Sequence, residues 1–354
     1  MGLDNPLEPT AEYRWLELSR AARKLIEEIF PIQPGEQVLI IADTLSDWRV
    51  VQAVSRATCA LGAVPATIVY PATAAPATDP PRPVAAAMAT CDAAIELEGS
   101  YLHHSPAQRA AMKAGVRLMV MGGGVDEFVR LVGDYRYPVL ARLVRALNEL
   151  TTHDRQKVHV TSEAGTDLWV APRYREEFGS EIIRLSRRYG IEAKGYAQVP
   201  PGQTNWDHMA DSPEGVMVFD GFAWPPDEVN VLHEPVRLTI EKGTIRKIEG
   251  GRQAMLFERW LRSWGHPAML RIAHCTYGCN PGVWQLKGNV AYDERVFGCV
   301  LFGIGPAWEG APSHTDGSML SASLWADDVQ ILERGRFVHP ELVALAHELG
   351  AKGY

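Results

Sequence analysis

Gln37-Val38-Leu39-Ile40-Ile41-Ala42 is the stretch that decides the fold class, because it is an almost unbroken apolar run. Such a run is typical of a strand that is buried on both faces of a sheet. A helix is expected next, through residues 50–54, and a second strand over residues 65–70. A strand, a helix and another strand in this order predict a parallel sheet. No G-x-G-x-x-G sequence follows the first strand, so the fingerprint of dinucleotide binding is absent.

The first half of the chain continues this alternation of strands and helices. The expected elements are an amphipathic helix over residues 12–30 and two more strands over residues 93–97 and 116–121. Residues 1–152 are therefore predicted to form an α/β, Rossmann-like N-terminal domain with a parallel sheet.

Two adjacent histidines follow the third expected strand. Ligands of open α/β sheets bind beyond the carboxyl ends of the strands, and His103 and His104 have this position in the sequence. We expect one of the two to act on a substrate. Solvent-exposed imidazoles in a loop before a helix are the alternative.

The composition is typical of a globular protein with two domains. The length of 354 residues exceeds one ordinary core, and 46% of the residues are hydrophobic while 22% are charged. A net charge of −8 argues against a nucleic-acid partner. No apolar run reaches the roughly 18 residues that span a membrane, and the first residues lack a signal-peptide pattern. Five cysteines without framework spacing indicate a reducing compartment, so we expect a cytoplasmic protein.

The pattern changes near residue 151, where hairpins replace crossover helices. Alternating segments cover residues 157–162, 168–170, 215–220 and 236–248, and one helix is expected over residues 252–264. Residues 153–354 are therefore predicted to form a C-terminal α+β domain. The domain boundary is expected between residues 150 and 158.

Ser313-His314-Thr315-Asp316-Gly317 contains a histidine and an aspartate two residues apart. In an extended segment these side chains point to the same side. His274, at the end of the short apolar run 270–273, is the best candidate for a third ligand. Two histidines and one carboxylate with open positions form the facial triad of non-heme Fe(II) oxygenases. The spacing alone leaves a surface turn, or a histidine oriented by its neighbouring carboxylate, as alternatives.

The second half resembles the thermophilic-metalloprotease family of aminopeptidases in several segments that follow in the same order. These segments are Ala164-Gly165-Thr166-Asp167, Pro200-Pro201-Gly202-Gln203, His274-Cys275-Thr276-Tyr277-Gly278-Cys279-Asn280-Pro281, Gly298-Cys299-Val300-Leu301 and His314-Thr315-Asp316. The ligand positions differ, since Gln203 and His274 replace two glutamates of that family and Leu301 replaces a histidine. An amide and a leucine do not hold the second ion of a two-metal site. The resemblance therefore implies the fold, with one metal rather than two.

The remaining set of His274, His314 and Asp316 resembles the 2,5-dihydroxypyridine 5,6-dioxygenase family, ring-cleaving enzymes of nicotinic acid catabolism on the same scaffold. The resemblance implies Fe(II) at these residues, a dihydroxypyridine-like substrate that is opened to a product of the N-formylmaleamate type, O₂ as co-substrate, and a homo-oligomer. It also implies that His103 or His104 faces the substrate, in a cleft between the domains.

Three further residues are candidate substrate contacts: Gln203, Tyr277 and Trp284. Two other functions stay open at this point. One is an aminopeptidase-like or amidase-like hydrolase with a single zinc ion, because two histidines and a carboxylate also suit zinc. The other is a non-catalytic scaffold protein that keeps the fold as a binding or oligomerisation module.

Overall fold

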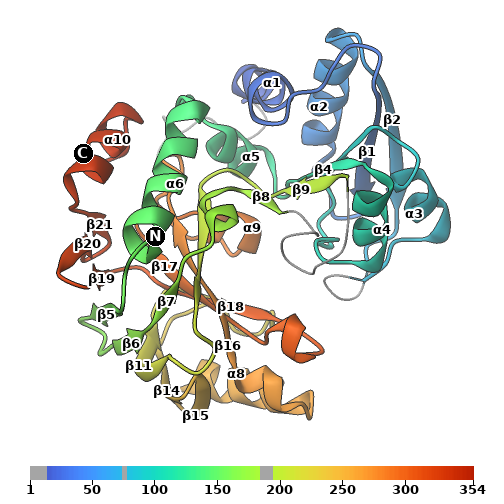
Figure 1. The fold of residues 1–354 in the computed structure, drawn as a ribbon. Coiled ribbons are helices and arrows are strands. Elements are labelled where there is room, and N and C mark those ends of the chain that lie inside the picture. Colours follow the sequence, from blue (N-terminus) through green and yellow to red (C-terminus); the bar gives the residue numbers. More distant parts are fainter. Residues whose placement is uncertain (1–13, 74–77, 184–193) are drawn as a thin grey trace, which may run out of the picture. The chain divides into compact units, whose positions relative to one another are not determined.

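The computed structural model describes residues 14–73, 78–183 and 194–354 (Figure 1). The chain forms two compact units, and each is assembled from two stretches of sequence. Unit 1 comprises Met1–Asp134 and Ile182–Pro201, and unit 2 comprises Tyr135–Glu181 and Gly202–Tyr354.

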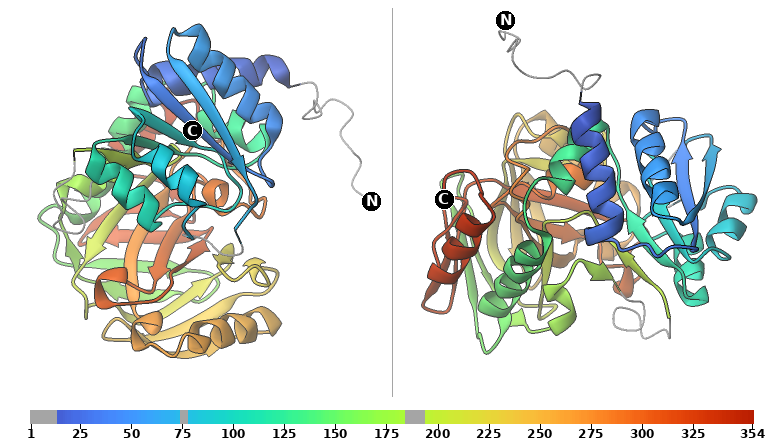
Figure 2. Two further views of the ribbon diagram at one scale, coloured as in Figure 1. Left: turned by 90° about the vertical axis from the view of Figure 1, so that its right-hand side faces the viewer. Right: turned by 90° about the horizontal axis from the view of Figure 1, so that it is seen from above.

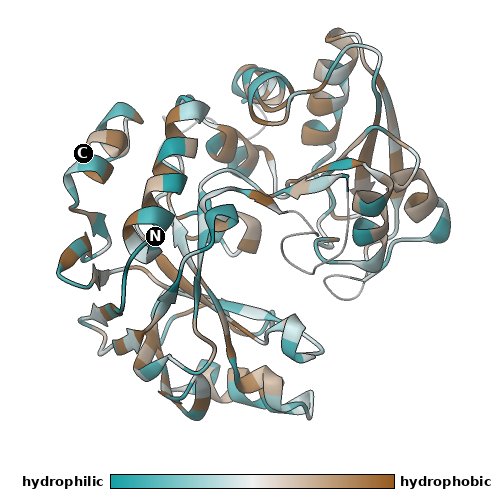
Figure 3. Ribbon diagram, viewed as in Figure 1, coloured by the Kyte–Doolittle hydropathy of each residue, from teal (hydrophilic) through white to brown (hydrophobic). Residues whose placement is uncertain are grey.

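Unit 1 contains the predicted parallel sheet. Its strands lie in the order β2-β1-β3-β4-β9-β8, and all neighbours run parallel except the antiparallel pair β9 and β8. The strands are β1 (Gln37–Asp43), β2 (Val64–Tyr70), β3 (Ala93–Glu96), β4 (Arg117–Val120), β8 (Ile182–Ile183) and β9 (Tyr196–Gln198). β1 is buried from its second residue onward, as its apolar run predicted, and Figure 3 shows hydrophobic residues on these strands. Because β2 and β3 flank β1 on opposite sides, the strand order reverses beside β1.

Helices cover both faces of this sheet, with α1, α2 and α5 on one face and α3 and α4 on the other (Figures 1 and 2). They are α1 (Trp15–Lys24), which continues as the π-helical turn η2 (Leu25–Ile29), α2 (Trp48–Ala60), α3 (Arg82–Met88), α4 (Pro106–Ala114) and α5 (Val125–Val132). The helix predicted over residues 12–30 is thus present from residue 15. Residues 1–13, on which the signal-peptide prediction rests, lie outside the described residues.

Unit 2 contains two sheets in which neighbouring strands run antiparallel throughout. The first has the order β13-β12-β18-β17-β16-β10-β7 and the second the order β15-β14-β11-β6-β5-β19-β20-β21. The strands of the first are β7 (Pro172–Arg173), β10 (Gln203–His208), β12 (Phe222–Trp224), β13 (Asn230–Val231), β16 (Ile272–Gly278), β17 (Val300–Ile304) and β18 (Thr315–Met319). Those of the second are β5 (Val158–Ser162), β6 (Asp167–Val170), β11 (Glu214–Phe219), β14 (Val236–Glu241), β15 (Thr244–Glu249), β19 (Ala322–Ala326), β20 (Val329–Glu333) and β21 (Arg336–Phe337).

One hydrophobic core joins both sheets of unit 2 and three of the helices below, α6, α8 and α10, with Trp206, Phe302 and Leu238 among its buried residues. The helices are α6 (Tyr137–Thr152), α8 (Arg252–Ser263), α9 (Val290–Asp293) and α10 (Pro340–Glu348), with the 3₁₀ turns η3 (Glu176–Gly179), η4 (Pro267–Leu270) and η5 (Ala307–Glu309). No helix in the described part of the chain has both the length and the apolar character that crossing a membrane requires.

The two units differ from the predicted division after residue 152. α6 belongs to unit 2, because Leu140, Leu143 and Leu147 on its buried face are part of the unit 2 core. β8 and β9 belong to unit 1, because β9 extends the parallel sheet by pairing with β4. The α/β fold with a parallel sheet first and antiparallel sheets afterwards is as predicted.

A buried carboxyl group connects two segments of unit 2. Glu181 accepts hydrogen bonds from the backbone N–H of Gly202 and from the hydroxyl of Tyr137, the latter at 2.9 Å. Burial raises the pKa of Glu181 to about 7, although these hydrogen bonds favour the charged form. The group is therefore a source of pH-dependent stability.

Candidate metal centre

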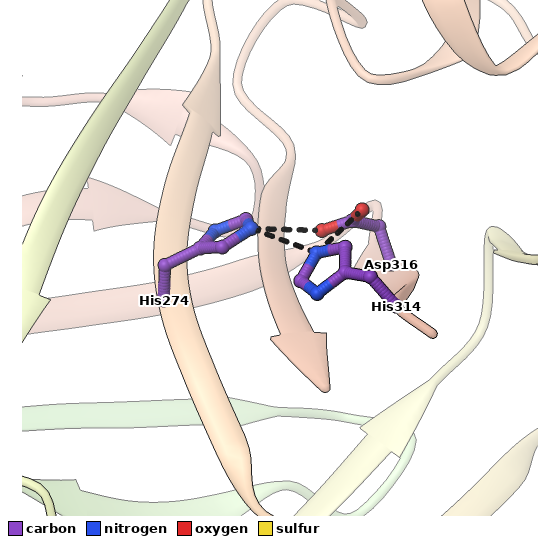
Figure 4. Close-up of side chains that lie close together, drawn as sticks. All are labelled: His274, His314 and Asp316. Carbon is purple, nitrogen blue, oxygen red and sulfur yellow. Dashed lines mark hydrogen bonds and ion pairs between the residues drawn. The ribbon is translucent and has the colours of Figure 1, made fainter. Parts of the chain in front are cut away.

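Three neighbouring strands of the first sheet in unit 2 bring the predicted ligands together. His274 on β16 is paired with Gly303 on β17, and Gly303 is paired in turn with Asp316 on β18. His314 directly precedes β18, two residues before Asp316, so both side chains point to the same side. Figure 4 shows the two imidazoles and the carboxylate converging on one point.

The donor atoms have the separations that a single ion requires. His274 Nε2 lies 3.0 Å from His314 Nε2 and 3.4 Å from Asp316 Oδ1, and His314 Nε2 lies 3.2 Å from Asp316 Oδ2. Two donors about 2.1 Å from one ion, at about 90 to 110° to each other, are about 3.0 to 3.4 Å apart. Among the described residues, this is the one group of three histidine, cysteine or acidic side chains that could hold an ion.

Each imidazole is oriented through its other nitrogen. His314 Nδ1 lies 3.1 Å from the carbonyl oxygen of Gly305, which can only accept a hydrogen bond. His274 Nδ1 lies 3.2 Å from Thr276 Oγ1, whose hydroxyl donates to Asn205 Oδ1 at 2.9 Å. Both Nδ1 atoms are therefore the donors, and both Nε2 atoms keep a lone pair with which they could bind an ion. Such partners fix the tautomer and the direction of a ligand histidine.

Gly303 makes room for the His274 ring. A Cβ atom at this position would lie 2.5 Å from Nε2 and 2.7 Å from Cδ2 of His274. Since real Cβ atoms do not approach other atoms so closely, any other residue here would force the His274 ring out of its position. This residue was not predicted from the sequence, because the pairing that brings it opposite His274 joins segments about thirty residues apart.

Gln203, a predicted substrate contact, belongs to a buried polar cluster. Arg295 donates to Gln203 Oε1 and to Glu294 Oε2, each at 2.5 Å, and Gln203 Nε2 donates to Glu294 Oε2 at 3.1 Å. Burial raises the pKa of Glu294; Arg295 opposes this shift and the charge of Asp316 adds to it. The cluster therefore lies within electrostatic range of Asp316 and His314, and the amide of Gln203 has a fixed orientation.

The other two predicted substrate contacts lie elsewhere in unit 2. Tyr277 is a core residue: it is fully buried, stacks on Trp206, and its hydroxyl lies 2.8 Å from Thr151 Oγ1. Because it is three residues from His274 on the same strand, it faces the opposite side of the sheet, which corrects the prediction of a pocket wall. Trp284 is 46% exposed, with the ammonium of Lys352 5.6 Å from its ring centroid.

Leu301 is an aliphatic residue on the strand next to His274. It lies on β17 opposite Thr276, is almost completely buried, and offers no donor atom to an ion.

His103 and His104 lie in unit 1, in the loop between β3 and α4. Their rings are 3.8 Å apart, and the ring of Tyr101 is 5.8 Å from that of His103. His103 is buried and His104 is half-buried. The loop begins beyond the carboxyl end of β3 in the parallel sheet, as the sequence predicted.

The fold and the three ligands define a class of protein, an α/β protein with a possible three-residue metal site on an antiparallel sheet. The chain belongs to the 2,5-dihydroxypyridine 5,6-dioxygenase family, whose sequence model matches residues 21–339. It is thus related to an oxidoreductase family, and a dioxygenase role follows from this membership.

Known proteins agree with this membership. The chain is 28% identical to the 2,5-dihydroxypyridine 5,6-dioxygenase of Pseudomonas putida KT2440 over 266 residues, which are 68% of this chain and 69% of that protein. The solved structure of 2,5-dihydroxypyridine dioxygenase from the same strain has a TM-score of 0.72 and 20% identity, over 95% of this chain and 99% of the other. AmpT from Thermus thermophilus has a TM-score of 0.64 and 14% identity, over 92% and 100%. At these identities the two structures show the fold.

Proposed function

We propose that the protein is a mononuclear non-heme Fe(II) dioxygenase that opens the ring of 2,5-dihydroxypyridine, or of a close analogue, to a product of the N-formylmaleamate type. The observation that carries this proposal is the convergence of two Nε2 atoms and one carboxylate within 3.0 to 3.4 Å of one another. Family membership supplies the reaction class. In this reaction both atoms of O₂ enter the product, so no external reductant is needed.

The residues present fit Fe(II). Two neutral imidazoles and one carboxylate on one face form the ligand set of non-heme Fe(II) oxygenases, which leaves positions for a substrate and O₂. Fe(II) bound there supplies the redox chemistry that lets an electron-rich ring react with O₂. The protein would hold the two imidazoles in place through Thr276 and Gly305, and Asp316 would provide one negative charge.

We assign acid–base help to His103 or His104. An imidazole titrates near neutrality, so it can accept the proton of a substrate hydroxyl and return it to the product. Gln203 remains a proposed substrate contact through its amide group, whose orientation is fixed by Arg295 and Glu294. Single alanine variants of His103 and His104 decide which of the two acts, because only the variant of the acting histidine should lose turnover.

One metal per chain follows from the charges near the site. Two divalent ions beside Asp316 as the single anionic ligand would leave about three uncompensated positive charges, at a large electrostatic cost. The cationic Arg295 already holds Gln203 and Glu294. A hydrolase with one zinc ion remains the second candidate, because the same three ligands suit zinc.

We also propose a cytoplasmic location, which the five free cysteines support, and a homo-oligomeric assembly with a small aromatic substrate as ligand. The test of the proposed function is anaerobic loading with Fe(II), followed by ultraviolet monitoring of a panel of hydroxypyridines and dihydroxybenzenes after O₂ is admitted. We expect bleaching of a dihydroxypyridine only with iron and O₂ together. Hydrolysis of a peptide or amide bond by the zinc-loaded protein without O₂ would favour the hydrolase.

A further inference from the structure

A buried carboxylate of unit 1 holds the loop that carries His103 and His104. Asp43, the last residue of β1, is 3% exposed. Its Oδ1 accepts the backbone N–H of Gly99 at 3.0 Å, and its Oδ2 accepts the backbone N–H of Ser100 at 2.8 Å and the Ser100 hydroxyl. Its Oδ1 also accepts the N–H of Leu45 at 2.9 Å. One carboxylate thus connects the loops that follow β1 and β3.

These contacts keep Asp43 charged. Burial works against the charged form, but the hydrogen bonds from Ser100, Gly99 and Leu45 outweigh it and lower the pKa of Asp43 below its ordinary value. Hydrogen bonds to an ionised acceptor are about twice as strong as those between neutral groups. The start of the loop is therefore firmly attached to the end of β1.

Other buried groups hold the rest of the loop. Glu98 Oε1 accepts the backbone N–H of Leu102 at 3.0 Å. Gln108 Oε1 accepts the backbone N–H of His104 at 2.9 Å, while the Gln108 amide donates to both oxygens of Glu96 at 3.1 Å. Each of these polar side chains is at least nine-tenths buried. Hydrogen bonds from buried side chains therefore fix the loop backbone at Leu102 and His104 as well.

The loop backbone is strained where the histidines lie. Tyr101 and His104 have positive φ angles of 59° and 72°, a backbone conformation that is uncommon for residues other than glycine. Gly99 passes so close to Leu45 that a Cβ atom would lie 2.6 Å from the Leu45 Cβ. Strain of this kind persists only where surrounding contacts impose it, and it is concentrated at functional sites. The loop also lies beside β1 and β3, where the strand order reverses and open α/β sheets bind ligands.

We propose that Asp43 is a positioning residue, which fixes the conformation of residues 99–104 and thereby the direction of the His103 and His104 imidazoles. This inference rests on the proposed acid–base role of one of these histidines. Asp43 itself acts only through the backbone of the loop. Its predicted effect is therefore on turnover and on loop order, and not on metal binding, because the three ligands belong to unit 2.

The experiment compares Asp43→Asn with Asp92→Asn in the full chain loaded with Fe(II). Asp92 is a matched control, because its carboxylate also accepts one backbone N–H in unit 1, from Gln37 at 2.8 Å, but at the opposite end of β1. We expect Asp43→Asn to bind iron as the wild type does and to lower kcat by about a hundredfold, the loss that a misplacement of about 1 Å causes. Asp92→Asn should stay close to the wild type.

A double-mutant cycle separates positioning from general stability. In the background of whichever of His103→Ala and His104→Ala loses activity, Asp43→Asn should cause little further loss, because the two changes remove one function. Losses that multiply, or an Asp43→Asn variant with wild-type kcat, would overturn the proposal.

Hydrogen exchange gives a readout that does not depend on catalysis. Amides of residues 99–104 should exchange faster in Asp43→Asn than in Asp92→Asn, with other protected segments unchanged. Unchanged exchange in this loop would reject the positioning role even if the wild type showed no dioxygenase activity, and inactivity of the wild type would count against the proposed function alone. If Asp43→Asn does not fold, Ser100→Ala removes one contact to the same carboxylate and should show both effects more weakly.

Discussion

Replacing Gly303 by alanine should weaken metal binding without unfolding the protein. The new Cβ would lie 2.5 Å from His274 Nε2, whereas ordinary contacts of a Cβ begin at 3.4 Å. The imidazole therefore has to withdraw by about 0.9 Å, from 2.5 to 3.4 Å. Metal–ligand bonds tolerate deviations of about 0.2 Å, so the displaced nitrogen no longer fits a site formed with His314 and Asp316.

The expected size of the effect is a loss of about 10- to 100-fold in affinity, the range found when a ligand histidine loses its orientation. The assay is anaerobic titration of the metal-free protein with Fe(II) in competition with a chromogenic chelator. Gly179→Ala is the control, because the same added methyl group in unit 2 meets its neighbours at 3.4 to 3.5 Å. Wild-type affinity in Gly303→Ala, with a circular dichroism spectrum like that of the control, would refute the geometry proposed for the site.

Three further predictions follow from the same structure. Alanine variants of the ligands, His274→Ala, His314→Ala and Asp316→Ala, should each lose bound iron and turnover while remaining folded; a variant that binds iron normally and turns over would remove that residue from the ligand set. Gln203→Glu should still bind one metal per chain by elemental analysis, because Arg295 would pair with the new carboxylate; two metals would contradict this reason. Glu181→Gln should gain stability relative to the wild type as pH rises from about 4.5 through 7, since the raised pKa of Glu181 means that its ionisation destabilises the fold in this range. Urea unfolding gives the difference in unfolding free energy between Glu181→Gln and the wild type, and this difference should be larger at pH 8 than at pH 5 by at most about 3 kcal/mol. The same difference at both pH values would disprove the assignment.

The fold could be predicted where the hydrophobic pattern is strong. The apolar run of β1 and the alternation of β5 and β6 are local signals, and the structure confirms all three strands. β9 could not be predicted in the same way, because its three residues are too few to show a period and its place beside β4 is set by tertiary packing. β10 was missed for another reason. Polar side chains of this strand are buried and hydrogen-bonded, so hydrophobicity does not alternate along Gln203-Thr204-Asn205-Trp206-Asp207-His208.

The candidate site was predictable to the extent that its residues are chemically distinctive. His314 and Asp316 share a side of one segment, and His274 was chosen as the third ligand from its place at the end of a short apolar run, which the resemblance then supported. Gly303 and Gly305 act through their backbone, and their roles arise from strand pairing and loop geometry that a single sequence does not report. The misassignment of Tyr277 was avoidable, since an offset of three residues from His274 in a strand predicts the opposite face.

Incorporation of labelled oxygen by the iron-loaded protein tests the central claim most directly. The protein is loaded anaerobically with Fe(II), its iron content is measured, 2,5-dihydroxypyridine and ¹⁸O₂ are added, and the product is analysed by mass spectrometry. The account predicts one iron per chain and a ring-opened product in which each molecule carries both heavy atoms of one ¹⁸O₂ molecule. A product with one heavy atom or none, or a protein that holds two metals per chain, would contradict it.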